Sequence, residues 1–242
     1  MGWLEDIAKM LPVEKVYDDA VQPAFREIGD VARNTIKASR FILAPIDYLA
    51  AQQDRYQAFL KKVNDKVPEE RMIPAHPQIA GPVIEGLRYL EQDNLLSELF
   101  INLLARAIDK ERVSEAHPAF ASIISQLSPD EAIIIFHLNK KQYLFKQYSK
   151  FFLETHTFGP REVTQNDFPI KDLIYPQNFG LYMDHMHSLN LGGIWQQGNQ
   201  ETIMEEGKQT GVNIISISQL TSFGKLFSQA CMPEEINIEK SV

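Results

Sequence analysis

Histidines, paired acids and one cysteine are the residues of this chain whose types suit catalysis or metal binding. His185 and His187 lie two positions apart on a predicted helix, where such residues face different directions and make a poor metal pair. Asp130 and Glu131 are adjacent carboxylates, but both fit the first turn of a predicted helix, where acids are favoured. Cys231 lacks a convincing histidine and asparagine arrangement, which favours a buried, inert thiol. We therefore expect no catalytic residue and no metal site.

Common enzyme motifs are also missing from the sequence. It contains no phosphate-binding GxxxxGK[ST] loop, no HExxH and no GxSxG. A single cysteine allows no intramolecular disulfide and no zinc site built on thiolates alone, which suits a reducing cytoplasm. We predict a cytoplasmic protein that is not an enzyme and binds no cofactor.

Charge is distributed unevenly along the 242 residues, whose formal net charge is −8. An acidic surface repels phosphate backbones, so nucleic-acid binding is not expected in general. Residues 31–66 are the exception, because they carry seven Lys or Arg and three acids. This basic region falls on the amphipathic N-terminal part of the chain.

Between Pro23 and Pro45, apolar residues recur at spacings of three and four, which predicts one face of an amphipathic helix. Arg33, Lys37 and Arg40 accompany that face. Such a helix packs against a helical bundle or lies on an anionic membrane surface. We favour packing and keep the membrane as an alternative.

Two later patterns predict further helices. An apolar stripe from Leu95 to Ile108 is typical of a helix at the centre of a bundle. Ser128-Pro129-Asp130-Glu131 is a capping box, in which serine caps the helix and the glutamate bonds back to it. Periodicity then predicts helices over about 142–153 and 176–188, with irregular chain between them.

The C-terminal part has a different pattern. Residues 189–195 and 212–217 favour two strands of a hairpin, with a bend at Gly193. Thr221 is the predicted cap of a final helix. Three helices, a hairpin and a helix follow the order of a winged helix.

These patterns predict a mainly α fold, a helical bundle with a C-terminal winged-helix-like portion that contains a small β-hairpin. Ser128, Glu131, Thr221 and Gly193 are the residues on which this architecture depends. The predicted parts are amphipathic helices (1–66), a proline-rich linker (67–82), the central bundle (83–127), the winged-helix-like portion (128–232) and a flexible tail (233–242).

A winged helix often binds DNA, but the helix in the recognition position, 176–188, has no Lys or Arg. A basic cluster of Lys140, Lys141, Lys146 and Lys150 lies on the preceding predicted helix. We expect protein contacts or dimerisation here, and nucleic-acid binding is the less favoured alternative.

Short motifs along the chain together resemble the Abi-alpha (abortive infection alpha) family, a bacterial family of unknown molecular function. They include Asn102-Leu103-Leu104-Ala105-Arg106-Ala107, His117-Pro118-Ala119-Phe120, the capping box and Leu220-Thr221-Ser222-Phe223-Gly224. The resemblance covers roughly residues 20–230 and implies a role in abortive infection or a related anti-phage response. It supplies no catalytic residues.

The predicted function is that of a non-catalytic anti-phage protein that acts through protein–protein interaction. The partner is unknown, and either a phage protein or a second copy of the chain fits. The candidate interaction surface comprises Arg33, Lys37, Arg40, Lys140, Lys141, Lys146 and Lys150. The alternatives are an effector at the inner membrane surface, which uses residues 1–66, and a winged-helix nucleic-acid-binding regulator.

Overall fold

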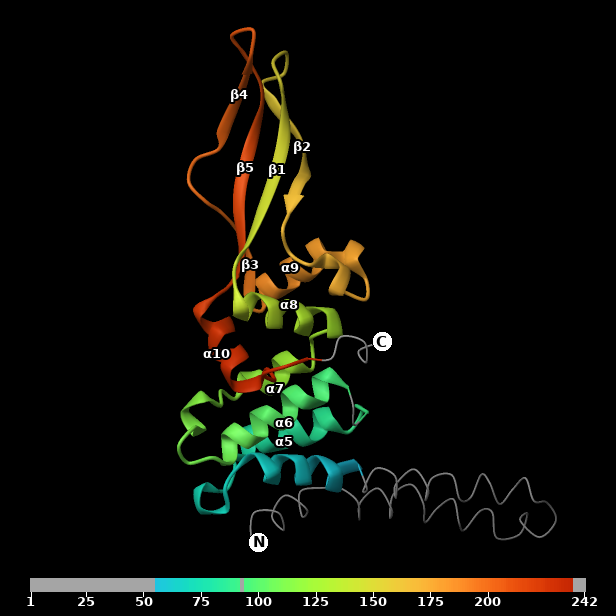
Figure 1. Cartoon of the computed structure of the whole chain (residues 1–242), viewed down its shortest axis with the longest axis vertical. Helices are drawn as coiled ribbons and strands as arrows, with labels where there is room; N and C mark the ends of the chain where they lie inside the picture. Colours follow the sequence, from blue (N-terminus) through green and yellow to red (C-terminus); the bar gives the residue numbers. More distant parts are fainter. Residues whose placement is uncertain (1–54, 92–93, 237–242) are drawn as a thin grey trace, which may run out of the picture. The chain divides into compact units, whose positions relative to one another are not determined.

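A computed structural model describes residues 55–91 and 94–236 of the chain (Figure 1). The chain divides into two compact units. Unit 1 covers residues 1–125 and unit 2 covers residues 126–242, and each is described by itself.

The first described residues, 55–66, form a helix of unit 1. Phe59 in this helix is 1% exposed and belongs to the core of the unit. The basic positions Arg33, Lys37 and Arg40, and the amphipathic pattern around them, lie outside the described residues.

Unit 1 continues as short helices: η2 (Glu69–Arg71), α5 (Pro77–Leu87), α6 (Leu95–Ile108), η3 (Val113–Glu115) and α7 (Ala119–Ile124). The prediction of a central apolar helix is confirmed by α6, in which Leu99 is fully buried. This helix begins where the Asn94 side chain accepts the N–H of Leu96 at 2.8 Å, a typical N-cap. α5 packs closely on α6 at Gly86, because a Cβ there would overlap the ring of Phe100.

Unit 2 combines helices with a sheet. Its elements in chain order are α8 (Pro129–Lys140), β1 (Tyr143–Phe152), β2 (Thr157–Asn166), η4 (Ile170–Asp172), η5 (Pro176–Asn178), α9 (Phe179–Ser188), β3 (Gly192–Gln196), β4 (Glu201–Glu205), β5 (Lys208–Leu220) and α10 (Ser222–Cys231). All strand pairs are antiparallel, in the order β2-β1-β5-β3, and β4 also pairs with β5. The hairpins β1–β2 and β4–β5 extend away from the helices of this unit (Figure 1).

β5 is the central strand, and its side chains alternate between the two faces of the sheet. Val212, Ile214, Ser216, Ser218 and Leu220 are buried, whereas the residues between them are half-buried. This period of two is typical of a sheet that packs one face on a core and leaves the other less covered. The strand prediction for residues 212–217 is therefore confirmed within β5.

Several local predictions are confirmed. Ser128 and Glu131 form the capping box of α8: the serine N–H donates to the carboxylate at 2.7 Å, and the N–H of Glu131 donates to the serine hydroxyl at 3.3 Å. Thr221 caps α10, because its hydroxyl accepts the N–H of Gly224 at 2.8 Å. The helix predicted over 176–188 is present as η5 and α9.

The predicted fold class is wrong. The structure is a sheet-containing α/β fold with five antiparallel strands, not a mainly α bundle with a small hairpin in a winged helix. The segment predicted as a helix over 142–153 is the strand β1, and β2 lies in the segment predicted as irregular. In unit 1, α5 begins at Pro77, within the segment 67–82 predicted as a linker.

The physical reason lies in long-range pairing. Apolar residues of 142–153 include a spacing of four (Leu144, Tyr148, Phe152), which fits a helix, and Tyr143 and Phe145, two positions apart, also fit a strand. The segment forms a strand because it pairs with β5, about 65 residues further along the chain. β2 is an exposed edge strand that contains Pro160, and such strands lack the apolar alternation on which sequence prediction relies.

Candidate interaction surface

Two faces of the unit 2 sheet differ in how they are covered. On one face, Tyr143 and Phe145 are buried, and their rings contact Phe168 and Phe179 at centroid distances of 5.2 and 6.4 Å. On the other face, which we call the open face, the side chains are only half-buried. The open face comprises Leu144, Lys146, Tyr148, Lys150 and Phe152 of β1, Trp195 of β3, and Ile215 and Ile217 of β5.

Strand register brings the apolar residues of the open face together. Ile217 pairs with Leu144 on one side and with Trp195 on the other, so the three side chains form one row across the sheet. The next row pairs Ile215 with Lys146. The result is a band of aliphatic and aromatic side chains with a lysine beside it.

Gly193 explains how Trp195 fits at the edge of this band. A Cβ at Gly193 would lie 3.0 Å from the tryptophan ring and 3.1 Å from Nδ1 of His187. The rings of His187 and Trp195 are 5.8 Å apart at their centroids. A larger residue at position 193 would be tight against the indole, and this gives Gly193 a packing role within the strand β3.

The four lysines predicted as one basic cluster on a helix are arranged differently. Lys140 ends α8, Lys141 is its C-cap, and Lys146 and Lys150 lie on the open face of β1. Lys146 and Lys150 are four strand residues apart, which corresponds to roughly 13 Å. The lysines thus border a sheet and do not share a helical face.

Three of these lysines lie over aromatic rings. Nζ of Lys140 is 3.9 Å from the ring centroid of Phe136, and Nζ of Lys141 is 4.9 Å from that of Tyr143. Nζ of Lys150 is 5.5 Å from the ring centroid of Phe152, at the outer end of the open face. Cation–π contacts at exposed sites contribute about 0.5–1 kcal/mol each, and the ammonium groups keep their charge available to a partner.

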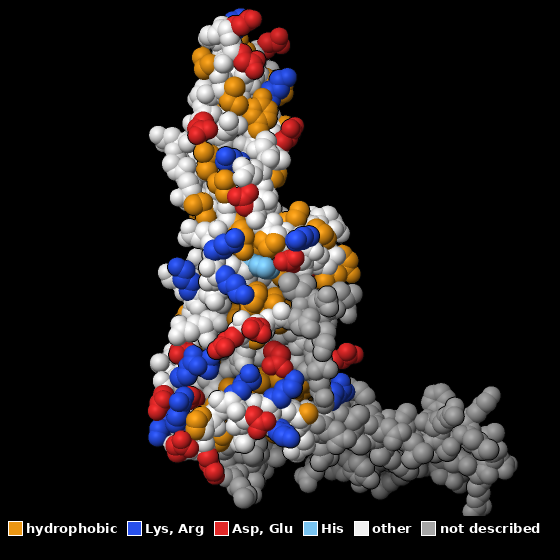
Figure 2. Space-filling model, viewed as in Figure 1, with side chains coloured by type: hydrophobic (Ala, Val, Ile, Leu, Met, Phe, Trp, Pro, Cys, Tyr) orange, Lys and Arg blue, Asp and Glu red, His pale blue; other side chains and the backbone are white. Residues whose placement is uncertain are grey.

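Large apolar side chains remain exposed on the hairpins. Phe152, Leu153, Phe158, Met204 and Val163 are between 43% and 57% exposed. Figure 2 shows hydrophobic side chains along the strand hairpins among scattered charges of both signs. Strand register places Phe152 on the open face, whereas Phe158 and Val163 pair with Phe151 and Gln147 of the other face, so these side chains form no single patch.

Buried acids at the start of α8 are the most chemically distinctive group in unit 2. The Asp130 carboxylate accepts the N–H groups of Ile174 at 2.6 Å and Tyr175 at 2.9 Å. Glu131 lies 2.5 Å from Nδ1 of His185 and also accepts the hydroxyl of Ser128 at 2.8 Å. Because the serine donates to the carboxylate and not to the imidazole, the three groups do not form a nucleophile–base relay. Both acids connect α8 to the chain around α9.

His137 and Asp172 form a second pair, with Nε2 3.2 Å from Oδ2. Burial lowers the pKa of His137, and the nearby carboxylate of Asp172 partly opposes this shift. The imidazole also packs edge-on against Phe168, with centroids 5.4 Å apart. These contacts position the segment after β2 against α8.

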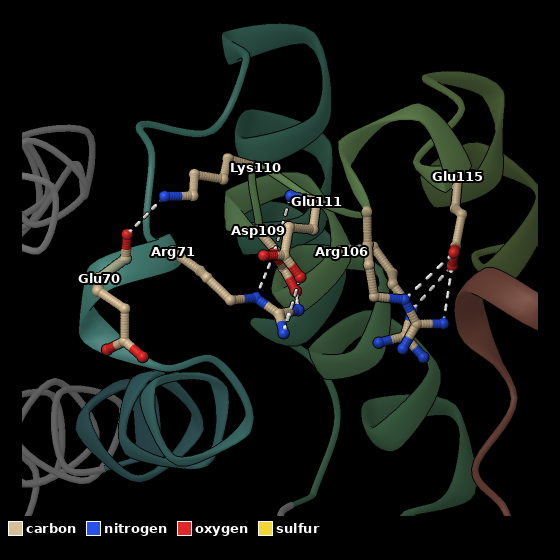
Figure 3. A network of polar contacts seen from close by, with 8 residues as sticks. Glu70, Arg71, Arg106, Asp109, Lys110, Glu111 and Glu115 are labelled. Carbon is tan, nitrogen blue, oxygen red and sulfur yellow. Dashed lines mark hydrogen bonds and ion pairs between the residues drawn. The ribbon is translucent and has the colours of Figure 1, made fainter.

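Unit 1 holds the densest network of charges (Figure 3). The guanidinium of Arg71 donates to both oxygens of the buried Asp109 and lies 3.1 Å from Glu111. This pairing holds the pKa of the Asp109 carboxyl below its usual value. The network ties η2 to the end of α6, since Met72 and Asp109 also form an isolated β-bridge. These contacts stabilise the unit.

A second ion-pair group in Figure 3 involves Glu115 of η3. Its carboxylate lies 3.2 Å from Nε of Arg106 and 2.9 Å from the guanidinium of Arg112. Here two guanidinium groups share one carboxylate within the unit, so the group fits a structural role.

The described residues contain neither a metal-binding cluster nor a membrane-spanning helix. Between residues 55 and 236, leaving out 92–93, no three His, Cys, Asp or Glu side chains are placed to bind a metal ion. In the same part of the chain, no helix has the length and apolar composition that a bilayer span requires.

Taken together, fold and surface define a protein with one all-helical described unit and one α/β unit whose sheet has an open, apolar and lysine-bordered face. A family model described as abortive infection alpha matches residues 51–231, about three quarters of the chain. The chain therefore belongs to the abortive infection alpha family, and this membership indicates a bacterial anti-phage defence role. No curated protein and no solved structure matches the chain.

Sequence reasoning missed most of the open face. It selected Lys146 and Lys150, but not Leu144, Trp195 or Ile217. The available signal was the alternation in β1, which agrees in phase with that of β5 once the two strands are paired. Without that pairing, the sequence does not show that these residues lie on the same face of the sheet.

Proposed function

We propose that this protein serves anti-phage defence without catalysis, by binding a protein partner through the open face of the unit 2 sheet. The observation that carries the proposal is the row of Leu144, Ile217 and Trp195 on a face that also bears Lys146 and Lys150 and ends at the exposed Phe152. An apolar centre with charged residues at its edge is the usual composition of a protein-binding surface.

Charge indicates what the partner offers. Lys146 and Lys150 lie on this face, and neither forms an ion pair with a carboxylate of the described residues. Two acids share the face, because Glu162 and Glu201 lie in the same row as Tyr148. A partner with an apolar surface and charges of both signs around it would match the face in both respects. A nucleic acid would find the lysines but would leave the aliphatic row without complementary contacts.

The proposal is tested by changing the face while leaving the core intact. The variant Lys146→Glu/Lys150→Glu/Phe152→Ser is expected to lose most of the protection, measured as phage plating efficiency on cells that express the chain. Its melting temperature should stay close to that of the wild type, because these side chains are half-buried or exposed. Lys225→Glu, an exposed charge reversal on α10, is the matched control and should protect normally. Unchanged protection by the triple variant contradicts the proposal.

Photocrosslinking identifies the class of partner. We expect benzoylphenylalanine at Phe152, but not at Lys225, to give a discrete protein adduct in infected cells. A nucleic-acid adduct at position 152 would overturn the protein-partner proposal. So would the absence of any adduct from a variant that still protects cells.

The non-catalytic part of the proposal has its own test. His185→Gln removes the titratable imidazole beside Glu131 while keeping a side chain that can donate a hydrogen bond. We expect protection to persist, because the pair supports the fold. Loss of protection with an unchanged melting temperature would instead favour a chemical role for His185.

The same proposal places the protein in the cytoplasm. Fractionation of expressing cells is expected to recover the chain with cytoplasmic markers before infection. Recovery with the inner membrane before infection would contradict this placement.

A further inference from the structure

Unit 1 has an apolar groove beside the packing contact of Gly86 with Phe100. Its volume is about 400 Å³, within the range of sites that bind ligands or peptide side chains. α5 contributes Pro82, Glu85 and Gly86, followed by Tyr89 and Leu90; α6 contributes Leu96 and Phe100, and the end of α7 contributes Ile124 and Ser125. The groove therefore lies among three helices of one unit.

Small residues create the hollow. Pro82, Gly86 and Tyr89 follow spacings of four and three on α5 and its C-terminal extension, so they line one face. Neither Pro82 nor Gly86 carries a long side chain, and Gly86 is also needed for close packing on Phe100. Tyr89 stands at the rim and is 69% exposed. A face of this kind accepts the side chains of a second helix at spacings of three and four.

The lining has one charged residue, the exposed Glu85, whose carboxylate is 3.9 Å from Arg88. An occupant with apolar anchors and basic neighbours would therefore be complementary. Residues 24–43 of this chain have that sequence. Phe25, Ile28, Ala32 and Ile36 follow helical spacing. Arg33, Lys37 and Arg40 are the basic neighbours.

The chain can also reach the groove. Arg55, the first described residue, lines a small cavity with Leu87 and Arg88, at the C-terminal end of α5. Position 55 lies twelve residues after position 43, and a chain of twelve residues spans up to about 40 Å. α5 has eleven residues and is only about 16 Å long. The tether is therefore long enough to bring residues 24–43 to either end of the groove.

We infer that the unit 1 groove is the docking site of residues 24–43 of the same chain, with apolar anchors in the groove and the basic side chains toward Glu85. Docking withdraws the apolar face of these residues from solvent. It thereby prevents the segment from binding an anionic membrane surface. This inference concerns a surface separate from the open face, so it stands or fails independently of the proposed function.

Disulfide trapping in the full-length chain tests the contact. Tyr89→Cys is combined in turn with Ile28→Cys, Ala32→Cys and Ile36→Cys, and the thiols are oxidised with copper phenanthroline. Disulfide formation requires Cα atoms within about 7 Å, so only a docked segment is trapped. We expect at least one pair to give a fast-migrating monomer on a non-reducing gel. Glu111→Cys, also exposed in unit 1, replaces Tyr89→Cys in the control and should give no such product.

Other outcomes of the trapping experiment overturn the inference. A disulfide-linked dimer would show that the groove receives a second copy of the chain. The absence of a product from all three pairs would show that the segment does not occupy the groove. Chains with a single added cysteine measure any product formed with the buried Cys231.

A second measurement does not depend on thiols. Leu90→Lys places a cation in the groove, and Val113→Lys is the control at an exposed apolar position of the same unit. If the segment is docked, trypsin cleavage after Arg33, Lys37 and Arg40 should accelerate about tenfold in Leu90→Lys alone. The same variant should gain flotation with vesicles of anionic phospholipid. Equal cleavage and equal flotation in the two variants would refute the docking.

Discussion

Asp109 in unit 1 and Asp130 in unit 2 are both almost fully buried carboxylates, but their hydrogen bonds come from different kinds of donor. Asp109 is bound mainly by the guanidinium of Arg71, a long side chain that is partly exposed, and it accepts one backbone N–H, that of Glu111 at 3.0 Å. Asp130 is bound by the backbone N–H groups of Ile174 and Tyr175, which cannot move without moving the chain.

The tightest glycine contacts of the two units also differ, because one involves a side chain and the other involves the backbone. In unit 1, Gly86 lies against the side chain of Phe100. In unit 2, Gly224 lies against the backbone of Leu191, whose carbonyl oxygen also accepts the N–H of Thr221 at 2.9 Å. We infer that unit 1 adjusts more easily to substitution, because side chains relax more readily than backbone does.

Paired glycine substitutions should show the largest difference. Gly224→Ala places a methyl group on the carbonyl of Leu191, and we expect a loss of about 4 kcal/mol or failure to fold. Gly86→Ala meets a phenyl ring that can shift, and we expect a loss of about 2 kcal/mol. Urea denaturation of both full-length variants measures the free energies of unfolding. Equal losses would show that the units do not differ in adaptability.

Substituting the buried acids should give an intermediate difference. Both oxygens of Asp130 accept backbone N–H groups, so in Asp130→Asn the amide N–H₂ faces one of these donors and cannot accept its hydrogen bond. We expect the free energy of unfolding to fall by about 2 kcal/mol. Asp109→Asn leaves Arg71 free to turn toward Glu111 and water, so we expect about 1 kcal/mol. Thermal melts of the two variants provide the comparison. A larger loss at Asp109 would reverse the ranking of the two units.

Helix caps should give a smaller difference. The Asn94 side chain of unit 1 accepts one N–H, whereas the Thr221 hydroxyl of unit 2 accepts the N–H of Gly224 and donates to the carbonyl of Asn190. Thr221→Ala is expected to cost about 1.5 kcal/mol and Asn94→Ala about 1 kcal/mol. Thr221→Ser restores both hydrogen bonds and serves as the matched control. If it is as unstable as Thr221→Ala, the methyl group and not the hydroxyl stabilises this position.

Alkaline pH is expected to affect unit 1 through Tyr56, whose hydroxyl donates to the carbonyl of Ile84 at 3.2 Å. Burial raises the pKa of Tyr56 to about 12. A raised pKa stabilises the folded state below the unfolded pKa of about 10. That contribution is lost as pH rises from about 10 toward 12. Denaturation of Tyr56→Phe between pH 9 and about 11.5 should therefore show a shallower decline than the wild type, and identical slopes would argue against this cause.

Mildly acidic pH is expected to affect unit 2 through His137. Burial lowers its pKa, so the unfolded chain takes up a proton at a higher pH than the folded chain does. Stability should fall as pH decreases through the ordinary histidine pKa of about 6.5. His137→Gln should flatten this part of the stability profile. An unchanged profile would show that Asp172 offsets the effect of burial.

Local structure could be predicted from the sequence where short-range chemistry decides it. The capping box at Ser128 and the cap at Thr221 involve residues three positions apart, so the sequence contains both donor and acceptor. The burial of α6 follows from its apolar composition, because eleven of its fourteen residues are buried. Such features depend on the geometry of one helix, which is the same in every fold.

Long-range pairing explains what could not be predicted. The segment that forms β1 has apolar spacings that fit two structures, and β5 selects between them. The lysines at positions 146 and 150 were identified as interaction residues, but their alignment with Ile215 and Gly211 depends on strand register. A shift of one residue would turn every side chain of β1 to the other face.

The sequence by itself determined the caps at Ser128 and Thr221, the apolar helix α6 and the family to which the chain belongs. Tertiary structure alone decided that Leu144, Trp195 and Ile217 share a row, and that Pro82, Gly86 and Phe100 enclose a groove. Caps depend on contacts within one turn of chain. Surfaces depend on which distant segments pack together, and burial of the whole core determines which segments do so.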